Sequence, residues 1–151
     1  MAETPTPYAS RIFLVQTDTT VGFLSQSAER LERVKSRLPG KSFLKVFAAL
    51  QPYRDSGRVP VRYKRMVRRS VRSTFVVKGE AFRIVAAGEH RDFLRSFGWM
   101  YSTSANRSGH AFERDYCEAY ADVIVEDLRG LHEREASHIW RLGNAARRRL
   151  R

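Results

Sequence analysis

The stretch STSANRSG, residues 102–109, gathers hydroxyl, amide and glycine residues in a chain that is otherwise rich in arginine. Apolar residues before it predict a strand over 99–105, and helix-forming residues after it predict a helix over 111–121. Small side chains in such a loop let backbone N–H groups approach an anion, and the hydroxyls and the Asn106 amide add directed donors. The pattern predicts a phosphate or ribose site, with an ordinary turn as the alternative.

On both sides of this loop, short apolar segments predict further strands, and segments with helical periodicity predict helices. Strands are predicted at 11–16, 42–50, 122–127 and 137–142, with two more in 73–87 around a turn at 78–80; helices are predicted at 25–40, 59–72 and 89–98, and a loop at 51–60. The two kinds of element do not alternate regularly, which favours a mixed sheet with flanking helices. We therefore expect an α/β fold of the α+β-like kind.

Length and charge limit the function. A chain of 151 residues is expected to form a single domain over 1–151. Its 28 Lys and Arg residues exceed its 16 Asp and Glu residues, for a net charge of +12, and most of the excess lies in residues 1–75. An excess of positive charge attracts phosphate groups. The expected ligands are therefore a nucleotide, an RNA or both, with a membrane surface as a weaker option.

Cysteine content and hydropathy indicate the compartment. The single cysteine, Cys117, cannot form an internal disulfide or a multi-cysteine metal site, which is typical of a reducing compartment. No segment approaches the roughly 20 apolar residues of a membrane span, and residues 1–11 lack the apolar run of a secretory signal. We therefore expect a cytoplasmic protein with no membrane partner.

The segment VPVRYKRMVRRSVR, residues 59–72, predicts an amphipathic basic helix. Val59, Tyr63, Val67 and Val71 recur every four residues and are expected to face the core, whereas a second face carries the arginines Arg62, Arg65, Arg69 and Arg72. These arginines are candidates for RNA binding, and a solvated surface is the alternative.

The segment KSRLPGK carries Lys35, Arg37 and Lys41 at the end of a predicted helix. Residues two apart do not share a helix face, so Lys35 and Arg37 converge on one ligand only if the helix stops there. Pro39 and Gly40 provide that stop. The alternative is that these cations interact favourably with the helix macrodipole.

These motifs occur together in the order and rough spacing of a known family. TDTTVGF at 17–23, KSR at 35–37, Thr74, Arg83 and the S-x-S-A-N-x-S-G pattern at 102–109 resemble the YrdC/YciO family, the threonylcarbamoyl-AMP synthases of tRNA modification. The resemblance covers nearly the whole chain and identifies it as a short, diverged member. It implies a twisted open sheet of mixed strands around a positively charged cavity. It also implies synthesis of threonylcarbamoyl-AMP from L-threonine, bicarbonate and ATP, with a separate transferase modifying the tRNA.

The resemblance also implies roles for individual residues. It assigns ATP contacts to Lys35, Arg37, Lys41, Ser104, Asn106 and Arg151, and threonine contacts to Thr17, Arg83, Ser102 and Ser137. No residue is an obvious nucleophile, so catalysis is expected to rest on positioning and on the charges of Lys35 and Arg37. Magnesium is expected to accompany ATP on its phosphates, with Asp18 the one carboxylate near the cavity and no metal ligated by the protein.

Several positions depart from the family pattern. Val21 replaces a tyrosine, Gln16 a proline and Val46 a histidine, while residues 70–72 replace a Pro-Gly-Pro segment and no proline follows Arg83. Most of these changes fall on the threonine side. They keep open a second interpretation, in which the chain is a non-catalytic YrdC-like module that binds RNA or a nucleotide.

Overall fold

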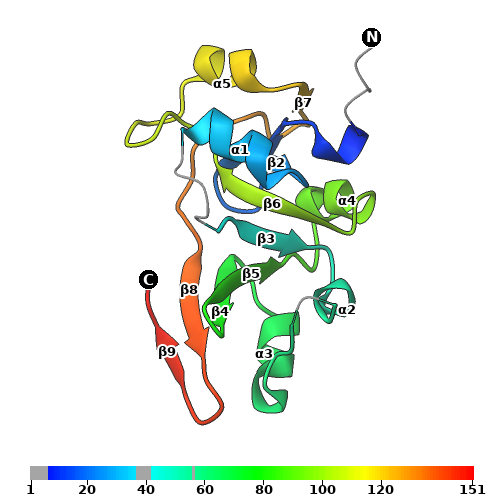
Figure 1. Cartoon of the computed structure of the whole chain (residues 1–151), viewed down its shortest axis with the longest axis vertical. Helices are drawn as coiled ribbons and strands as arrows, with labels where there is room; N and C mark the ends of the chain where they lie inside the picture. The colour runs from blue at the N-terminus through cyan, green and yellow to red at the C-terminus, as the bar shows by residue number, and fades with distance from the viewer. Residues whose placement is uncertain (1–6, 37–41, 56) are drawn as a thin grey trace.

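The computed structural model describes residues 7–36, 42–55 and 57–151, so that the predicted ligands Arg37 and Lys41 lie outside the described residues. These residues form one mixed sheet with helices around it (Figure 1). The strands are β1 (Phe13–Gln16), β2 (Val21–Ser25), β3 (Leu44–Phe47), β4 (Ser73–Val77), β5 (Glu80–Ile84), β6 (Trp99–Ser104), β7 (Val123–Val125), β8 (His138–Leu142) and β9 (Arg147–Arg149). The α-helices are α1 (Ala28–Lys35), α2 (Leu50–Tyr53), α3 (Lys64–Arg68), α4 (Glu89–Arg95) and α5 (Arg114–Tyr120), and short 3-10 helices lie at Tyr8–Ser10 and Val61–Tyr63.

The sheet has nine strands in the order β7-β1-β2-β6-β3-β5-β4-β8-β9. The pairs β1–β7, β3–β5 and β4–β8 are parallel, and the others are antiparallel. In Figure 1, α1 and α5 lie near the β1–β2 end of the molecule, and α2 and α3 lie near β4 and β5. The predicted fold class, a mixed parallel and antiparallel sheet flanked by helices, is therefore confirmed. No helix in the described ranges is both long enough and apolar enough to cross a lipid bilayer.

Apolar packing holds the helices on the sheet. Every residue of β1 and β2 is buried, which requires cover on both faces. On one face, Leu31 of α1 packs in a buried cluster with Phe23. At the other end of the sheet, Tyr53 of α2 stacks on Phe82 of β5, with ring centroids 3.9 Å apart. Each helix thus extends the core of the strands that it covers.

Several predicted elements have different boundaries in the structure. Ser27 caps α1 by accepting a hydrogen bond from the Arg30 amide, and Ser36 ends the helix in the left-handed region at φ 48°. The helix therefore covers Ala28–Lys35, about two turns, and is shorter than the predicted 25–40. The segment predicted as a loop over 51–60 contains most of α2, and neither β2 nor β9 was expected as a strand. β2 and β9 lack the polar-apolar alternation that marks a half-buried strand, because β2 is wholly buried and β9 is wholly exposed.

The basic helix predicted over 59–72 is wrong in its length. A 3-10 turn leads into α3, the helix ends at Arg68, and Arg72 has a positive φ of 52°. The chain must leave the helix here because β4 begins at Ser73. Val59, Tyr63 and Val67 are buried as expected, whereas Val71 is 75% exposed. The single stripe of Arg62, Arg65, Arg69 and Arg72 is therefore not formed: Arg72 leaves it and pairs with Glu135 at 3.8 Å.

Because the helix ends between Val67 and Val71, the same substitution at these two positions should lower the free energy of unfolding by different amounts. Val67→Ala should lower the free energy of unfolding by about 2 kcal/mol, because it removes buried methyl groups from the core under α3. Val71→Ala should change it by less than about 0.5 kcal/mol, because the Val71 side chain is exposed. Urea unfolding followed by circular dichroism measures both values, and equal costs would show that the helix continues to Val71.

α4 buries a histidine below the turn that joins β1 and β2. His90 is 1% exposed, and neither ring nitrogen has a hydrogen-bond partner among the described residues. Burial lowers the pKa of His90 to about 4; Asp18 opposes this shift, and the positive charges of Arg83 and Arg129 add to it. His90 is therefore neutral at pH 7.

The lowered pKa predicts a loss of stability in acid. An unfolded histidine titrates near pH 6.5, so between pH 6.5 and 4 the unfolded chain binds more protons than the folded one, and stability falls as the pH falls. Between pH 7 and 4.5, the wild type should lose about 2 to 3 kcal/mol more than His90→Leu, which cannot titrate. Urea unfolding at the two pH values tests this, and equal losses for both proteins would contradict it.

Candidate functional site

The pairing of β2 with β6 brings the motif at 17–23 next to the motif at 102–109. The turn at 17–20 joins β1 to β2, and β2 pairs with β6 so that Gly22 lies opposite Ser104. A Cβ atom at Gly22 would lie 3.0 Å from the Thr103 carbonyl oxygen and 3.3 Å from the Thr17 methyl group. The glycine therefore permits the close approach of the two motifs, which are some eighty residues apart in the sequence.

A cavity of about 220 Å³ lies beside this pairing. Residues from the 17–20 turn, β2, β3, β5, β6, the 136–137 segment and the chain end form its wall. Among them are six residues that the sequence predicted as ligand contacts: Thr17, Arg83, Ser102, Ser104, Ser137 and Arg151. Ser102 and Ser104 are two residues apart on β6, so they lie on the same face of the strand. The structure thus places all four predicted threonine contacts around one cavity, together with two of the predicted ATP contacts, whereas Lys35 and Asn106 do not line it.

Arg83 of β5 is the buried cation of this cavity, at 3% exposure. Its guanidinium forms an ion pair with Asp18 and donates a hydrogen bond of 3.1 Å to the Thr19 hydroxyl. Its Nε–H is buried without an acceptor among the described residues. The ion pair offsets much of the cost of burying the charge, and the bonds to Asp18 and Thr19 use two of the five N–H donors of Arg83, which leaves the Nε–H among the donors available to a ligand.

Lys35 fixes the loop that follows β6. The Lys35 ammonium donates hydrogen bonds to the carbonyl oxygens of Ser104 and Asn106, both at 2.9 Å, and to Asn106 Oδ1 at 2.6 Å. Ser108 donates in return to the Lys35 carbonyl at 3.3 Å. Lys35 therefore lies beside the cavity with its three N–H donors engaged by the 104–106 loop. The resemblance predicted that both motifs contact ATP, and the structure shows in addition that they bond directly to each other, with the lysine orienting the loop.

Ser137 and Arg151 meet at the opposite wall. The Ser137 and Thr74 hydroxyls share a buried hydrogen bond of 2.7 Å. Arg151 donates from Nε to the Ser137 carbonyl at 2.9 Å, and its Nη2 lies 3.4 Å from the Ser137 hydroxyl. Arg151 thus brings a second guanidinium to the cavity wall.

No pattern in the sequence indicated that residues 129–134 contact the 17–20 turn. Gln16 accepts a hydrogen bond from the His132 amide at 2.8 Å, and Arg129 donates to the Gln16 carbonyl at 3.0 Å. The Arg134 amide donates to the Thr20 hydroxyl at 3.2 Å. These contacts span more than a hundred residues, so no local pattern could reveal them. Gln16, at the position of a family proline, therefore ties the turn to the 129–134 segment.

The cavity is electropositive and offers little to a metal ion. Arg83 and Arg151 line it, and Asp18, the carboxylate expected nearby, is already paired with Arg83. Within the described ranges, no three His, Cys, Asp or Glu side chains group so as to hold a metal. The predicted RNA-binding residues do not line the cavity, but Arg72 reaches Glu135, the residue before the lining residue Ala136.

Comparisons with known proteins bear on the fold. No family model matches the chain. A curated relative, the uncharacterised MG259 homologue of Mycoplasma pneumoniae, is 26% identical over 97 residues, which span 63% of this chain but only 20% of that protein. The YciO structure from E. coli aligns with a TM-score of 0.73 at 17% identity, over 94% of this chain and 82% of that one. Sua5 of P. abyssi, solved with L-threonine, aligns with a TM-score of 0.71 at 15% identity, over 93% of this chain and 50% of that one.

The two structural matches cover almost all of this chain, but at low sequence identity. They therefore show that the fold is shared and do not show that the activity is shared. The extent of the match agrees with the mixed sheet and flanking helices described above. The chain therefore has the fold of the YrdC/Sua5 family.

Proposed function

We propose that the chain synthesises L-threonylcarbamoyl-AMP from L-threonine, bicarbonate and ATP, for use by a tRNA-modifying transferase. The observation that carries the proposal is the single cavity lined by residues from both predicted ligand sets, with Lys35 bonded to Asn106 and to the lining residue Ser104. A threonine complex of the Sua5 protein, which shares this fold, supports the amino-acid side of the proposal.

The proposed reaction joins two anions. Threonine first combines with bicarbonate to give a carbamate, with loss of water. A carbamate oxygen then attacks the α-phosphorus of ATP, the bond to the β-phosphate oxygen breaks, and pyrophosphate leaves. Cations around the cavity lower the repulsion between the two anions and stabilise the charge that develops at the α-phosphate. Magnesium bound to the ATP phosphates would supply further charge neutralisation.

The residues of the cavity suit separate parts of this reaction. Arg83 would bind the threonine carboxylate through donors not used by Asp18 and Thr19, and the hydroxyls of Thr17, Ser102 and Ser137 would add directed contacts. Ser104, Asn106 and Arg151 would contact ATP. Lys35 would hold the 104–106 loop in place and reach a phosphate by exchanging one of its three hydrogen bonds.

The direct test is an assay with the purified full chain, ATP, bicarbonate and threonine. We expect pyrophosphate release and a threonylcarbamoyl adenylate detectable by mass spectrometry, both dependent on threonine. Replacing threonine with each other amino acid tests the identity of the amine. If no amino acid supports pyrophosphate release while ATP still binds, the synthase proposal is wrong.

Lys35 provides a prediction for the nucleotide. Lys35→Ala should weaken ATP binding by about 1 to 3 kcal/mol, because it removes a charge-assisted contact and frees the 104–106 loop. Calorimetry with ATP measures the loss. Arg95→Ala, which removes an exposed cation on α4, serves as the control. Equal ATP affinity in wild type and Lys35→Ala would remove Lys35 from the site.

Arg83 provides a prediction for threonine. Arg83→Lys should raise the KM for threonine and leave ATP affinity unchanged, because an ammonium cannot contact Asp18, Thr19 and a carboxylate as the planar guanidinium does. Steady-state kinetics and ATP calorimetry measure the two effects separately. An equal loss for both substrates would instead indicate that Arg83 stabilises the cavity as a whole.

RNA binding is the second candidate function, and one observation favours it. The 3-10 turn and α3 both contact the β8–β9 hairpin: Arg62 of the turn donates to the Ala145 carbonyl at 2.5 Å, and Arg147 of β9 lies 3.1 Å from the sulfur of Met66 in α3. The exposed arginines of β9 thereby join those of the 3-10 turn and α3 at one end of the molecule. Such a surface would bind a polyanion backbone without using the cavity.

Salt dependence separates the two functions. Arg62→Ser with Arg65→Ser should flatten the slope of log K against log salt for tRNA by about 1.4 to 1.8, since two phosphate contacts are lost. Synthesis should persist in this variant. Arg11→Ser with Arg95→Ser is the matched control, because it removes two exposed cations from other elements. A variant that lost synthesis but kept its tRNA slope would place these arginines in the synthase.

A further inference from the structure

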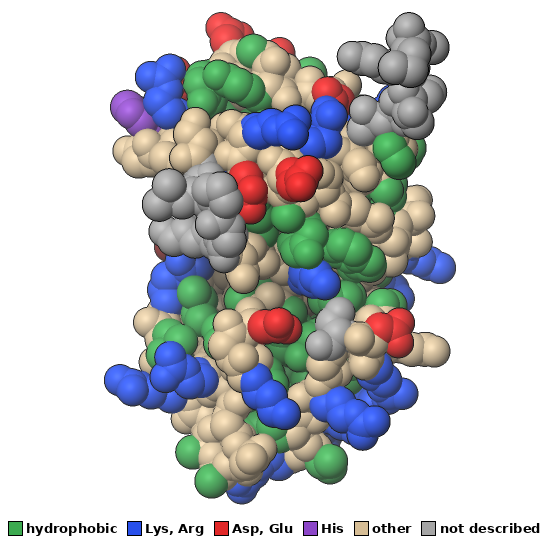
Figure 2. Space-filling model, viewed as in Figure 1, with side chains coloured by type: hydrophobic (Ala, Val, Ile, Leu, Met, Phe, Trp, Pro, Cys, Tyr) green, Lys and Arg blue, Asp and Glu red, His purple; other side chains and the backbone are tan. Residues whose placement is uncertain are grey.

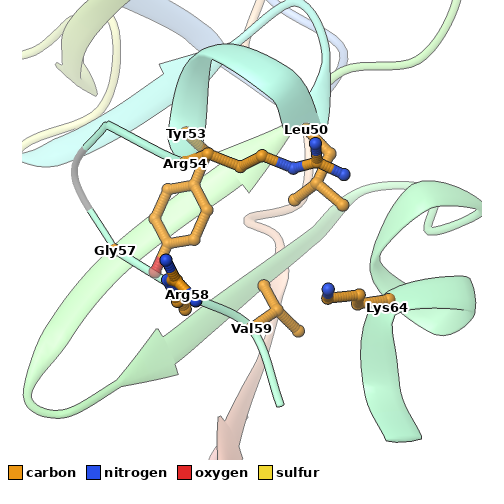
Figure 3. Close-up of a pocket in the computed structure, with 7 residues that line it drawn as sticks. All are labelled: Leu50, Tyr53, Arg54, Gly57, Arg58, Val59 and Lys64. Carbon is orange, nitrogen blue, oxygen red and sulfur yellow. The ribbon is translucent and has the colours of Figure 1, made fainter. Parts of the chain in front are cut away.

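A second hollow lies between α2, the loop after it and α3, away from the cavity already described. It has a volume of about 320 Å³, and it shares no lining residue with that cavity. Leu50, Tyr53 and Val59 provide an apolar floor, and three cations surround it: Arg54, Arg58 and Lys64. In Figure 3, the Lys64 ammonium points from α3 toward Val59, and Arg54 extends over Leu50.

A neighbouring hollow of about 380 Å³ shares Leu50 and Arg54 with the first. It opens where the parallel strands β3 and β5 end, and it adds Arg68 and Arg91 to the cations of the region. The crevice outside the carboxyl ends of parallel strands is a common place for ligands in open sheets. Figure 2 shows Lys and Arg side chains gathered over this half of the molecule, with fewer acidic groups among them.

Among the residues that the structure describes, the cations of the two hollows form no ion pair with an acidic side chain. Within residues 7–36, 42–55 and 57–151, no carboxylate forms an ion pair with Arg54, Arg58, Lys64 or Arg68. Arg91 donates from Nε to the Ala48 carbonyl at 3.3 Å. The five like charges that line the two joined hollows repel one another, and an anion placed among them would relieve that repulsion.

The floor of the first hollow is firmly held. Tyr53 stacks on Phe82 and packs edge-on against Phe47, and a Cβ atom at Gly57 would lie only 2.7 Å from the Tyr53 hydroxyl oxygen. Burial, together with the charge of Glu80, raises the pKa of Tyr53, so the phenol is neutral at pH 7. A preformed apolar floor with charged groups at its edge is the usual composition of a small-molecule site.

We propose that these joined hollows bind a small phosphorylated molecule with an apolar or aromatic portion, such as a nucleoside monophosphate. The phosphate would lie among Arg54, Arg58 and Lys64, and the apolar portion would contact Leu50 and Val59. Volumes of 320 and 380 Å³ suit such a ligand. A nucleic acid backbone fits less well, because it needs cations along a line, and these come from three directions to a concave surface.

The test is a titration of the full ¹⁵N-labelled chain with AMP as the probe, followed by NMR. AMP should shift the amide signals of Leu50, Tyr53, Gly57 and Val59, inorganic phosphate should do so more weakly, and adenosine should have little effect. Arg54→Ser with Arg58→Ser should weaken this binding by about tenfold or more for each arginine. Any AMP-dependent shifts at Gly22 and Thr103, which report the first cavity, should stay unchanged in that variant.

Arg11→Ser with Arg95→Ser is the matched control for charge, and it should bind AMP at the hollow as the wild type does. Three outcomes would overturn the proposal: AMP shifts confined to Gly22 and Thr103, equal shifts with adenosine, or shifts at the hollow caused by a short RNA duplex but not by AMP. None of these outcomes depends on the synthase activity. Failure of the proposed function would appear in the pyrophosphate assay and leave this titration unaffected.

Discussion

The antiparallel pairing of β2 with β6 joins the two halves of the cavity. Its backbone hydrogen bonds place the 17–20 turn beside the loop after Ser104, and β6 then pairs with β3 on its other edge. Gly22 is the residue that permits this contact, because any side chain there would press on the Thr103 carbonyl. Arg83, Ser137 and Arg151 reach the same cavity only because β5, β4 and β8 follow in the sheet order.

Polar contacts in the cavity are arranged around this backbone frame. Arg83 is paired with Asp18, Lys35 is bonded to the 104–106 loop, and Ser137 is bonded to Thr74 and Arg151. Buried polar groups are costly without partners, so these bonds keep the cavity formed in the absence of a ligand. Because Arg83 and Lys35 are already bonded, a ligand has to share or replace one of their hydrogen bonds. Substrate binding is therefore coupled to the positions of these two side chains.

Positive charge is distributed over distinct regions of the molecule. Arg83 and Arg151 serve the cavity, Arg62 and Arg147 hold α3 against the β8–β9 hairpin, and a further set surrounds the hollow beside α2. A net charge of +12 therefore does not act as one uniform field. Each region presents cations in a different geometry, and geometry distinguishes a small phosphorylated ligand from an extended nucleic acid.

The sequence alone determined many of the local elements, although not β2, β9 or α2, and it indicated which motifs belong together. The strand over 99–105 and the hairpin around Gly79 follow from apolar runs and from turn residues, and the structure confirms them; the helix predicted over 25–40 is also present, but it ends at Lys35. Resemblance to a family then indicated which residues would meet around a cavity. Arg37 and Lys41, outside the described residues, remain predictions.

The tertiary structure determined which side chains are buried, paired or exposed, because these properties depend on contacts between residues far apart in the sequence. β4 ends the basic segment after α3, so Val71 is exposed and Arg72 turns toward Glu135, although the four-residue spacing continues through both positions. Burial decided that His90 is neutral, and the contact of Gln16 with His132 depends on residues 116 positions apart. A sequence pattern records which side chains could share a face, but only the folded chain sets which of them are buried, paired or left facing a hollow.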